Sequence, residues 1–209
     1  MTTVAILDYG MGNLRSVEKA FEHVGVRAEI TSDHDRVRQA GGVVLPGVGA
    51  FPRAMERIRE LELGPLLHER REAGVPLLGL CLGMQLLFES TAELGGAEGV
   101  GLLEGTVERL EAPGLKVPHI GWNPVSWRNG GSDLAADMPD PCAFYHVHSF
   151  VARPAHEHDI AGTASYGGEF VSVVARPPVY GTQFHPEKSG PDGLRLLGNF
   201  AALCARVAA

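Results

Sequence analysis

Pro76-Leu77-Leu78-Gly79-Leu80-Cys81-Leu82-Gly83 is the stretch of sequence that decides the fold. A short apolar run leads directly into a cysteine with a glycine two residues away on either side. Met84, Leu87 and Phe88 then recur at helical spacing. The pattern predicts a buried strand that turns sharply into a helix. Glycines around such a turn allow a strained backbone that lifts the thiol of Cys81 off the sheet, as in a nucleophile elbow.

Strand and helix patterns alternate around this stretch through the first 90 residues. Residues 4–10 and 41–45 are further apolar runs that end in turn residues, and amphipathic helical patterns follow them. Such alternation predicts a parallel sheet with helices on both faces. Ligands of these sheets gather at the carboxyl ends of the strands, which are here residues 8–13, residues 46–51 and Cys81.

The second half of the chain has a different pattern, because strand-like runs outnumber helical ones from about Gly101 onward. A last helix is predicted over residues 192–207. The chain shows no internal repeat and no long linker, so we expect one domain over residues 1–209. We expect an α/β fold with an open, mixed, mostly parallel sheet flanked by helices. The strand-like runs are residues 107–110, 115–117, 144–150, 170–175 and 179–184.

Composition and charge exclude several classes of protein. The 209 residues carry 18 Lys and Arg against 25 Asp and Glu, a net charge of −7, without a basic cluster. Nucleic acid is therefore not an expected partner. The chain shows no signal peptide and no apolar run of about 18 residues, which predicts a cytoplasmic protein without a membrane anchor. Its three widely spaced cysteines are expected to be free thiols.

Cys81 is the candidate nucleophile. A helix that starts directly after the cysteine favours the thiolate form through its positive end, and its free N–H groups can hold an oxyanion. The alternative is a buried structural cysteine, which is the usual state of a free thiol. The strand, the flanking glycines and the helix together favour the nucleophile.

A cysteine nucleophile needs a base, and His185 is the candidate. His185 follows a strand-like run, and Glu187 comes two residues later, beyond a rigid proline. Residues i and i+2 of an extended chain point the same way, so Glu187 can orient His185 while the other ring nitrogen faces Cys81. The alternative is a solvated histidine beside a solvated glutamate.

Two further patterns have an active and an inert interpretation. Pro46-Gly47-Val48-Gly49 ends a strand at the same sheet edge, so its N–H groups are candidates for half of an oxyanion hole, and a plain tight turn is the alternative. Histidine pairs at His146 and His148 and at His156 and His158 invite a zinc hypothesis. No matching third ligand is evident, so neither a metal nor a cofactor is expected.

Taken together, residues 79–85 and Phe184-His185-Pro186-Glu187 resemble the class I glutamine amidotransferases, whose triad is Cys, His and Glu in that order. More narrowly, several segments are similar to the glutaminase subunits of imidazole glycerol phosphate synthases, a family of histidine biosynthesis. They occur in the right order along nearly the whole chain. These segments are residues 8–13, 46–51, 117–123, 147–149 and 185–189.

The resemblance implies a role for each matching residue. Cys81 attacks the side-chain amide of glutamine to form a glutamyl thioester, His185 is base and then acid, and Glu187 orients His185. The N–H of Leu82, with one from Val48 or Gly49 after a peptide rotation, forms the oxyanion hole. Residues expected to bind glutamine are Gln85, Gly47, His148 and Ser149.

The resemblance also implies a partner. Ammonia becomes non-nucleophilic ammonium in water, so it has to pass through a dry path to an acceptor site. The family's partner is a (β/α)₈-barrel cyclase subunit, in a heterodimer that makes imidazole glycerol phosphate and aminoimidazole carboxamide ribonucleotide. Trp122 suits an aromatic anchor at that interface, or else it packs in the core. Interface candidates are Asn13, Lys116, His119, Trp122 and Lys188.

Three other functions remain open at this point. A glutaminase subunit for another acceptor, as in pyridoxal 5′-phosphate synthesis, usually carries Pro-Gly-Gly-Glu-Ser where this chain has residues 46–50. A non-catalytic binding protein on the same fold would be expected to lack a triad member. A free-standing hydrolase of γ-glutamyl compounds would need no partner. One departure from the family is His146, where an apolar or aromatic residue is usual, and it leaves the local packing open.

Overall fold

A computed structural model describes residues 3–128 and 132–207. Its first part is a parallel sheet with strand order β2-β1-β3-β4-β13, and each strand pairs in parallel with its neighbours. β3 and β4 are buried along their whole length because helices cover both faces. The strands are β1 (Thr3–Leu7), β2 (Arg27–Thr31), β3 (Gly42–Gly47), β4 (Leu77–Cys81) and β13 (Val179–Thr182).

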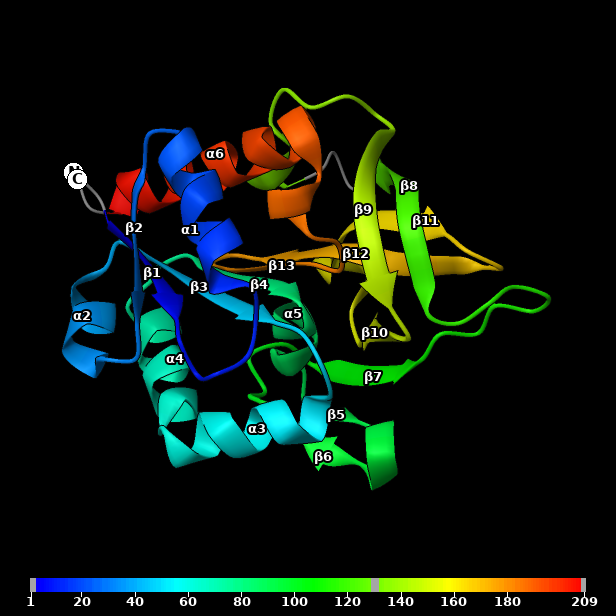
Figure 1. The fold of residues 1–209 in the computed structure, drawn as a ribbon, viewed down its shortest axis with the longest axis horizontal. Helices are drawn as coiled ribbons and strands as arrows, with labels where there is room; N and C mark the ends of the chain where they lie inside the picture. Colours follow the sequence, from blue (N-terminus) through cyan, green and yellow to red (C-terminus); the bar gives the residue numbers. More distant parts are fainter. Residues whose placement is uncertain (1–2, 129–131, 208–209) are drawn as a thin grey trace.

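The helices divide between the two faces of this sheet (Figure 1). α1 (Leu14–His23) and α6 (Gly190–Val207) lie on one face, where Phe21 and Phe200 join an apolar cluster. α3 (Phe51–Glu60) and α4 (Leu63–Glu72) lie on the other, where Ile58 and Leu66 belong to a second cluster. The short helices α2 (His34–Gln39) and α5 (Leu82–Leu86) follow β2 and β4.

An antiparallel extension continues the sheet beyond β13 in the order β12-β10-β7-β5-β6. These strands are β12 (Glu169–Arg176), β10 (Phe150–Pro154), β7 (Gly105–Arg109), β5 (Ser90–Thr91) and β6 (Ala97–Glu98). A branch of three strands leaves β12, consisting of β11 (Ile160–Ser165), β8 (His119–Trp127) and β9 (Cys142–His148). Short 3₁₀ helices lie at η1 (Glu93–Gly95), η2 (Asp133–Ala135), η3 (Glu157–Asp159) and η4 (Pro186–Lys188).

β13 occupies a central place between the two parts of the sheet. It pairs in parallel with β4 and antiparallel with β12, although β4 and β13 are far apart in the sequence. The carboxyl ends of β3, β4 and β13 therefore meet at one edge, with Gly47 opposite Cys81 in the register. The antiparallel branch that carries β9 rises beside this edge (Figure 1). The described residues thus form the predicted α/β fold with a mixed sheet and flanking helices.

One local prediction was wrong. No strand covers residues 115–117, because the N–H of Leu115 donates to the carbonyl of Ala112 in a turn, and the strand begins only at His119. The helix expected after residue 50 is present as α3, and Glu62, in a left-handed conformation (φ 51°), separates it from α4. Among the described residues, no helix combines the length and the apolarity that crossing a bilayer requires.

Candidate active site

The elbow at Cys81 has the strained backbone that the sequence predicts. Cys81 ends β4 with φ 54° and ψ −110°, and α5 begins at the next residue. A Cβ at Gly83 would overlap the carbonyl oxygen of Leu45, and one at Gly79 would lie 2.6 Å from the N atom of Met84. The turn therefore brings α5 so close to β3 and β4 that only glycine fits at these two positions.

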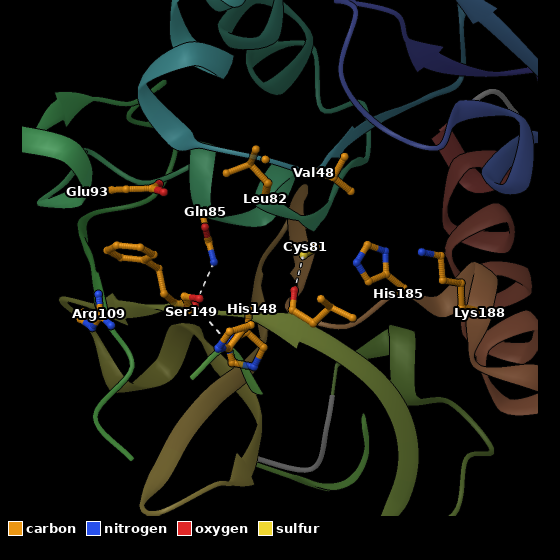
Figure 2. A pocket seen from close by; sticks show the side chains of 14 residues that line it. Val48, Cys81, Leu82, Gln85, Glu93, Arg109, His148, Ser149, His185 and Lys188 are labelled. Atoms are coloured by element: carbon orange, nitrogen blue, oxygen red, sulfur yellow. Dashed lines mark hydrogen bonds between the residues drawn. The ribbon is translucent and has the colours of Figure 1, made fainter. Parts of the chain in front are cut away.

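His185 lies beside Cys81, at the start of η4 (Figure 2). Its N–H donates to the carbonyl of Tyr145 on β9 at 3.0 Å, which ties the loop after β13 to the branch. Its ring Nδ1 is 2.9 Å from Oε1 of Glu187. Because a carboxylate only accepts, Nδ1 carries a proton and Nε2 is left for the thiol. Cys81 and His185 are only 6% and 5% exposed.

The charge on the His185 ring is favoured by its neighbours. Burial lowers the pKa of His185, but the interactions of its ring with Cys81 and Glu187 outweigh burial and raise the pKa to about 9. The imidazolium form is thus available at neutral pH. It can pair with a thiolate and later give its proton to a leaving group.

We expect the pKa of His185 to fall in a Glu187→Gln variant, because the amide removes a negative charge from the ring. A raised native pKa stabilises the fold fully below about pH 6.5, the unfolded value, and this contribution is lost as the pH rises through about 9. The stability advantage of the wild type over Glu187→Gln should therefore shrink between these values. NMR titration of the ring, with denaturant unfolding at several pH values, measures both. An unchanged titration midpoint in Glu187→Gln contradicts the assignment.

A cavity of about 400 Å³ opens at this edge of the sheet. It brings together most of the residues that the sequence singled out. These are Val48, Gly49, Cys81, Leu82, Gln85, His148, Ser149, His185 and Lys188. Residues of the lining that the sequence did not single out as site residues are Glu93, Arg109 and Phe150. Figure 2 shows Glu93 and Arg109 at one end of the cavity and Cys81, His185 and Lys188 at the other.

The thiol is held by both sides of the cavity. Cys81 Sγ lies 3.6 Å from the carbonyl oxygen of Val147 and 3.8 Å from Nε2 of Gln183. Gln85 also reaches across, since its Nε2 donates to the carbonyl of Phe150 and to Oε1 of Gln183, both at 3.0 Å. β9, β10 and β13 therefore position the groups around the nucleophile together with the elbow itself.

The carboxyl end of β3 is supported by Tyr9, which the sequence did not mark as a site residue. The Tyr9 hydroxyl donates to the carbonyl of Pro46 at 2.6 Å, and burial raises the pKa of Tyr9, so it stays protonated. A Cβ at Gly47 would lie 2.7 Å from that hydroxyl, so no side chain fits there. The expected contact of Gly47 with glutamine stays a prediction. Val48 is 41% exposed and lines the cavity, with Gly49 next to it at φ +103°.

The candidates for a partner interface separate into two groups. Asn13, Lys116, Trp122 and Lys188 are exposed, and Trp122, 58% exposed, does not pack in the core. His119 is buried, at 3% exposed, so its side chain is not available to a partner, and that expectation is wrong. The reason is the alternation along β8, which turns Ile120 and Trp122 outward and His119 and Asn123 inward.

The structure shows how His146 packs, which the sequence left open. It is fully buried, its ring Nδ1 donates to the carbonyl of Phe144, and its Nε2 is 2.8 Å from the hydroxyl of Ser172. Burial, with the nearby His148, lowers the pKa of His146 to about 3, so the ring is neutral. Within residues 3–128 and 132–207, no group of three or more His, Cys, Asp or Glu side chains is arranged to hold a metal ion.

Comparison with known proteins places the sequence and the fold in one family. Residues 5–203 match the family model described as glutamine amidotransferase class-I. In the solved structure of PurLQS from Thermotoga maritima, a chain has the same fold with a TM-score of 0.76 at 18% identity, over 96% of this chain and 98% of that one. A crystal structure titled glutamine amidotransferase gives 0.75 at 21% identity, over 97% and 98%. The chain belongs to the class-I glutamine amidotransferase family.

Relatives of higher sequence identity narrow the assignment within this family. The imidazole glycerol phosphate synthase subunit HisH of Moorella thermoacetica is 47% identical over 97% of this chain and 96% of its own length. HisH of Rhodopirellula baltica is 48% identical over 98% and 100%. Within its family, the chain is therefore a member of the HisH subunits.

Proposed function

We propose that this chain hydrolyses L-glutamine to L-glutamate and ammonia as the glutaminase subunit of imidazole glycerol phosphate synthase. The observation that carries the proposal is the cavity that joins Cys81 and His185 to a distant charged end. Thiol, imidazole and carboxylate follow one another as nucleophile, base and orienting group in Cys81, His185 and Glu187.

The charged end of the cavity suits the zwitterionic end of an amino acid. Glu93 and Arg109 carry opposite charges there, and no ion pair joins either of them to another described residue. Glu93 uses Oε2 to accept the N–H of Phe51 at 2.9 Å, which leaves its other oxygen for an α-ammonium group. Arg109 and the backbone of 147–149 then face the α-carboxylate. The γ-amide reaches Cys81 in this orientation.

The first half of the reaction forms a thioester. The thiolate of Cys81 attacks the amide carbon of glutamine, and the negative oxygen that forms is held by the N–H of Leu82 and by one from Val48 or Gly49. Loss of one such donor typically lowers the rate by about 10²- to 10³-fold. The imidazolium of His185 gives its proton to the departing nitrogen, and the C–N bond breaks to release ammonia.

The second half frees the enzyme. His185, now neutral, takes a proton from water, and the hydroxide attacks the thioester carbon. The carbon–sulfur bond breaks to return the thiolate, and the new carboxylic acid loses its proton to solvent as glutamate leaves. His185 returns to the imidazolium form, paired again with the thiolate of Cys81. Glu187 holds the ring in one orientation throughout.

The released ammonia has to reach an acceptor without meeting bulk water, where it would be protonated. We therefore assign this chain a (β/α)₈-barrel cyclase subunit as partner, seated over the exposed Asn13, Lys116, Trp122 and Lys188. Binding of that partner turns the exposed Val48 peptide toward the cavity, so that glutamine is not wasted in its absence. Residues 1–209 act as one glutaminase domain in the cytoplasm, where free thiols such as Cys81, Cys142 and Cys204 persist.

Glutamate release from glutamine tests this function. The purified chain is assayed alone and then with the cyclase subunit and its acceptor ligand. We expect a low rate alone and strong activation in the complex. A full rate by the free chain would contradict the activation step, and no glutamate in either case would contradict the proposed function.

A further inference from the structure

A row of buried polar side chains beneath the cavity has no part in the chemistry above. The Nδ1 of His119 is 3.0 Å from Nε2 of His148, and the Nδ1 of His148 is 3.0 Å from the carbonyl oxygen of Phe150. At the other end, Asn123 Nδ2 is 3.4 Å from Nε2 of His119 and 2.8 Å from the carbonyl oxygen of Ser165. The row thus runs from β8 to the wall of the cavity.

The groups at the two ends of this row determine which ring nitrogen of His119 and of His148 carries the proton. The Phe150 carbonyl only accepts, so Nδ1 of His148 is the protonated nitrogen and Nε2 of that neutral ring accepts. Nδ1 of His119 must then donate to it, and Nε2 of His119 accepts from the Asn123 amide. Burial lowers the pKa of His119, and burial together with the charge of His119 lowers that of His148 to about 3, so both rings stay neutral. Each ring has one allowed tautomer.

Packing holds the first ring of the row in place. The ring of His119 stacks on Tyr166 with centroids 4.1 Å apart and on His146 at 5.3 Å. It meets His148 edge-on at 5.1 Å. His119 can therefore aim its Nδ1–H at His148 without rotating away.

The row ends at the carbonyl oxygen of Phe150, which also accepts a hydrogen bond from Gln85. The Phe150 carbonyl accepts from both His148 Nδ1 and Gln85 Nε2, and Gln183 Oε1 accepts from the same Gln85 nitrogen. The Gln85 amide is thereby oriented with its nitrogen engaged, and no residue in the described part of the chain donates to its Oε1. That oxygen and Glu93 are acceptors suited to one positive group.

We infer that His119 is a positioning residue that makes the cavity select amides carrying an α-ammonium group. This inference rests on the proposed function, because it takes glutamine as the substrate. The His119 donor keeps the proton of His148 on Nδ1. If His148 carried its proton on Nε2, the lone pair of its Nδ1 would face the carbonyl oxygen of Phe150 and repel it. That oxygen also holds the Gln85 amide, so Gln85 would lose its orientation. Cys81 and His185 lie outside this row, so the chemical steps do not need it.

Two near-isosteric variants test the inference. The amide nitrogen of asparagine occupies the place of histidine Nδ1, whereas that of glutamine corresponds to Nε2. His119→Asn therefore keeps the donor to His148, and His119→Gln loses it. His146→Gln is the control, because it changes another buried ring of the same cluster whose bonds go to Phe144 and Ser172.

The measurement is kcat and KM of the chain with its cyclase subunit for L-glutamine and for glutaramate, the same amide without the α-amino group. We expect His119→Gln to lose about tenfold or more of the wild-type preference for L-glutamine, the size of one hydrogen bond to a charged group, mainly through KM. His119→Asn and His146→Gln should keep that preference. Circular dichroism verifies that each variant is folded.

The outcomes separate this inference from the proposed function. An active wild type with an unchanged preference in His119→Gln overturns the role of His119 alone. Equal losses in His119→Gln and His146→Gln also overturn it, since general loosening of the cluster would then be the cause. If His119→Asn loses the preference for L-glutamine, the claim that the donor to His148 is responsible is overturned. A wild type that releases no glutamate overturns the proposed function itself.

Discussion

Cys81→Ala is expected to lower glutamine-dependent synthesis by the complex by about 10⁴-fold or more, since no other group can form the thioester. Ammonia-dependent synthesis should continue, because an ammonium salt supplies the nucleophile directly to the partner. The substitution removes only the sulfur atom from the lining of a cavity, so the fold should remain. Product formation with glutamine and with ammonium chloride, measured side by side, provides the check.

Cys142→Ala is the matched control for this experiment. Cys142 is also a buried free thiol, but it lies at the far end of β9 from His148. We expect it to keep both activities, with a modest loss of stability of about 1 kcal/mol. If Cys81→Ala lost ammonia-dependent synthesis as well, the thiol would have a role outside ammonia production, contrary to the proposal.

Gly83→Ala is expected to have the second largest effect, on the fold itself. Its Cβ would overlap the Leu45 carbonyl oxygen, which belongs to a fully buried strand and has no room to move. Overpacking against backbone should lower the free energy of unfolding by about 3 kcal/mol or more. The elbow would open, so glutamate release should fall with stability. Urea unfolding measures the first effect, and the glutaminase assay of the complex measures the second.

Gly64→Ala separates this effect from any general intolerance of glycine replacement. Gly64 lies in the first turn of α4, and a Cβ there meets nothing within 4 Å. This variant should be neutral or more stable by up to about 1 kcal/mol, because alanine restricts the unfolded chain. A Gly83→Ala protein as stable as the wild type would contradict this prediction, because β3 would then be able to shift and make room for the added methyl group.

The features that the sequence predicted well are those encoded by neighbouring residues. The elbow at Cys81 follows from an apolar strand, two glycines and a helical repeat within about a dozen positions. The pairing of His185 with Glu187 follows from their spacing of two. Local patterns of this kind survive folding because the chain contacts itself at short range, so they also located the parallel strands β1, β3 and β4.

The features that the sequence did not predict depend on contacts between distant segments. Glu93 and Arg109 reach the cavity through β5, η1 and β7, and nothing near them in the sequence distinguishes them from solvated charges. The burial of His119 is different, because alternation along residues 119–123 already indicates that it and Trp122 face opposite ways. The alternation is thus a local signal that places His119 on the buried side of β8.

The central place of β13 has a consequence for how the protein is made. A ribosome releases residues 3–81 long before residues 179–182, so β4 waits with an unpaired edge while about a hundred residues are added. A strand edge exposed in this way is prone to pair with another nascent chain, which predicts that prematurely terminated products aggregate. The thiol of Cys81 is also translated well ahead of His185. Its partner base therefore arrives with the segment that closes the sheet, and a half-made chain carries the cysteine without the imidazole.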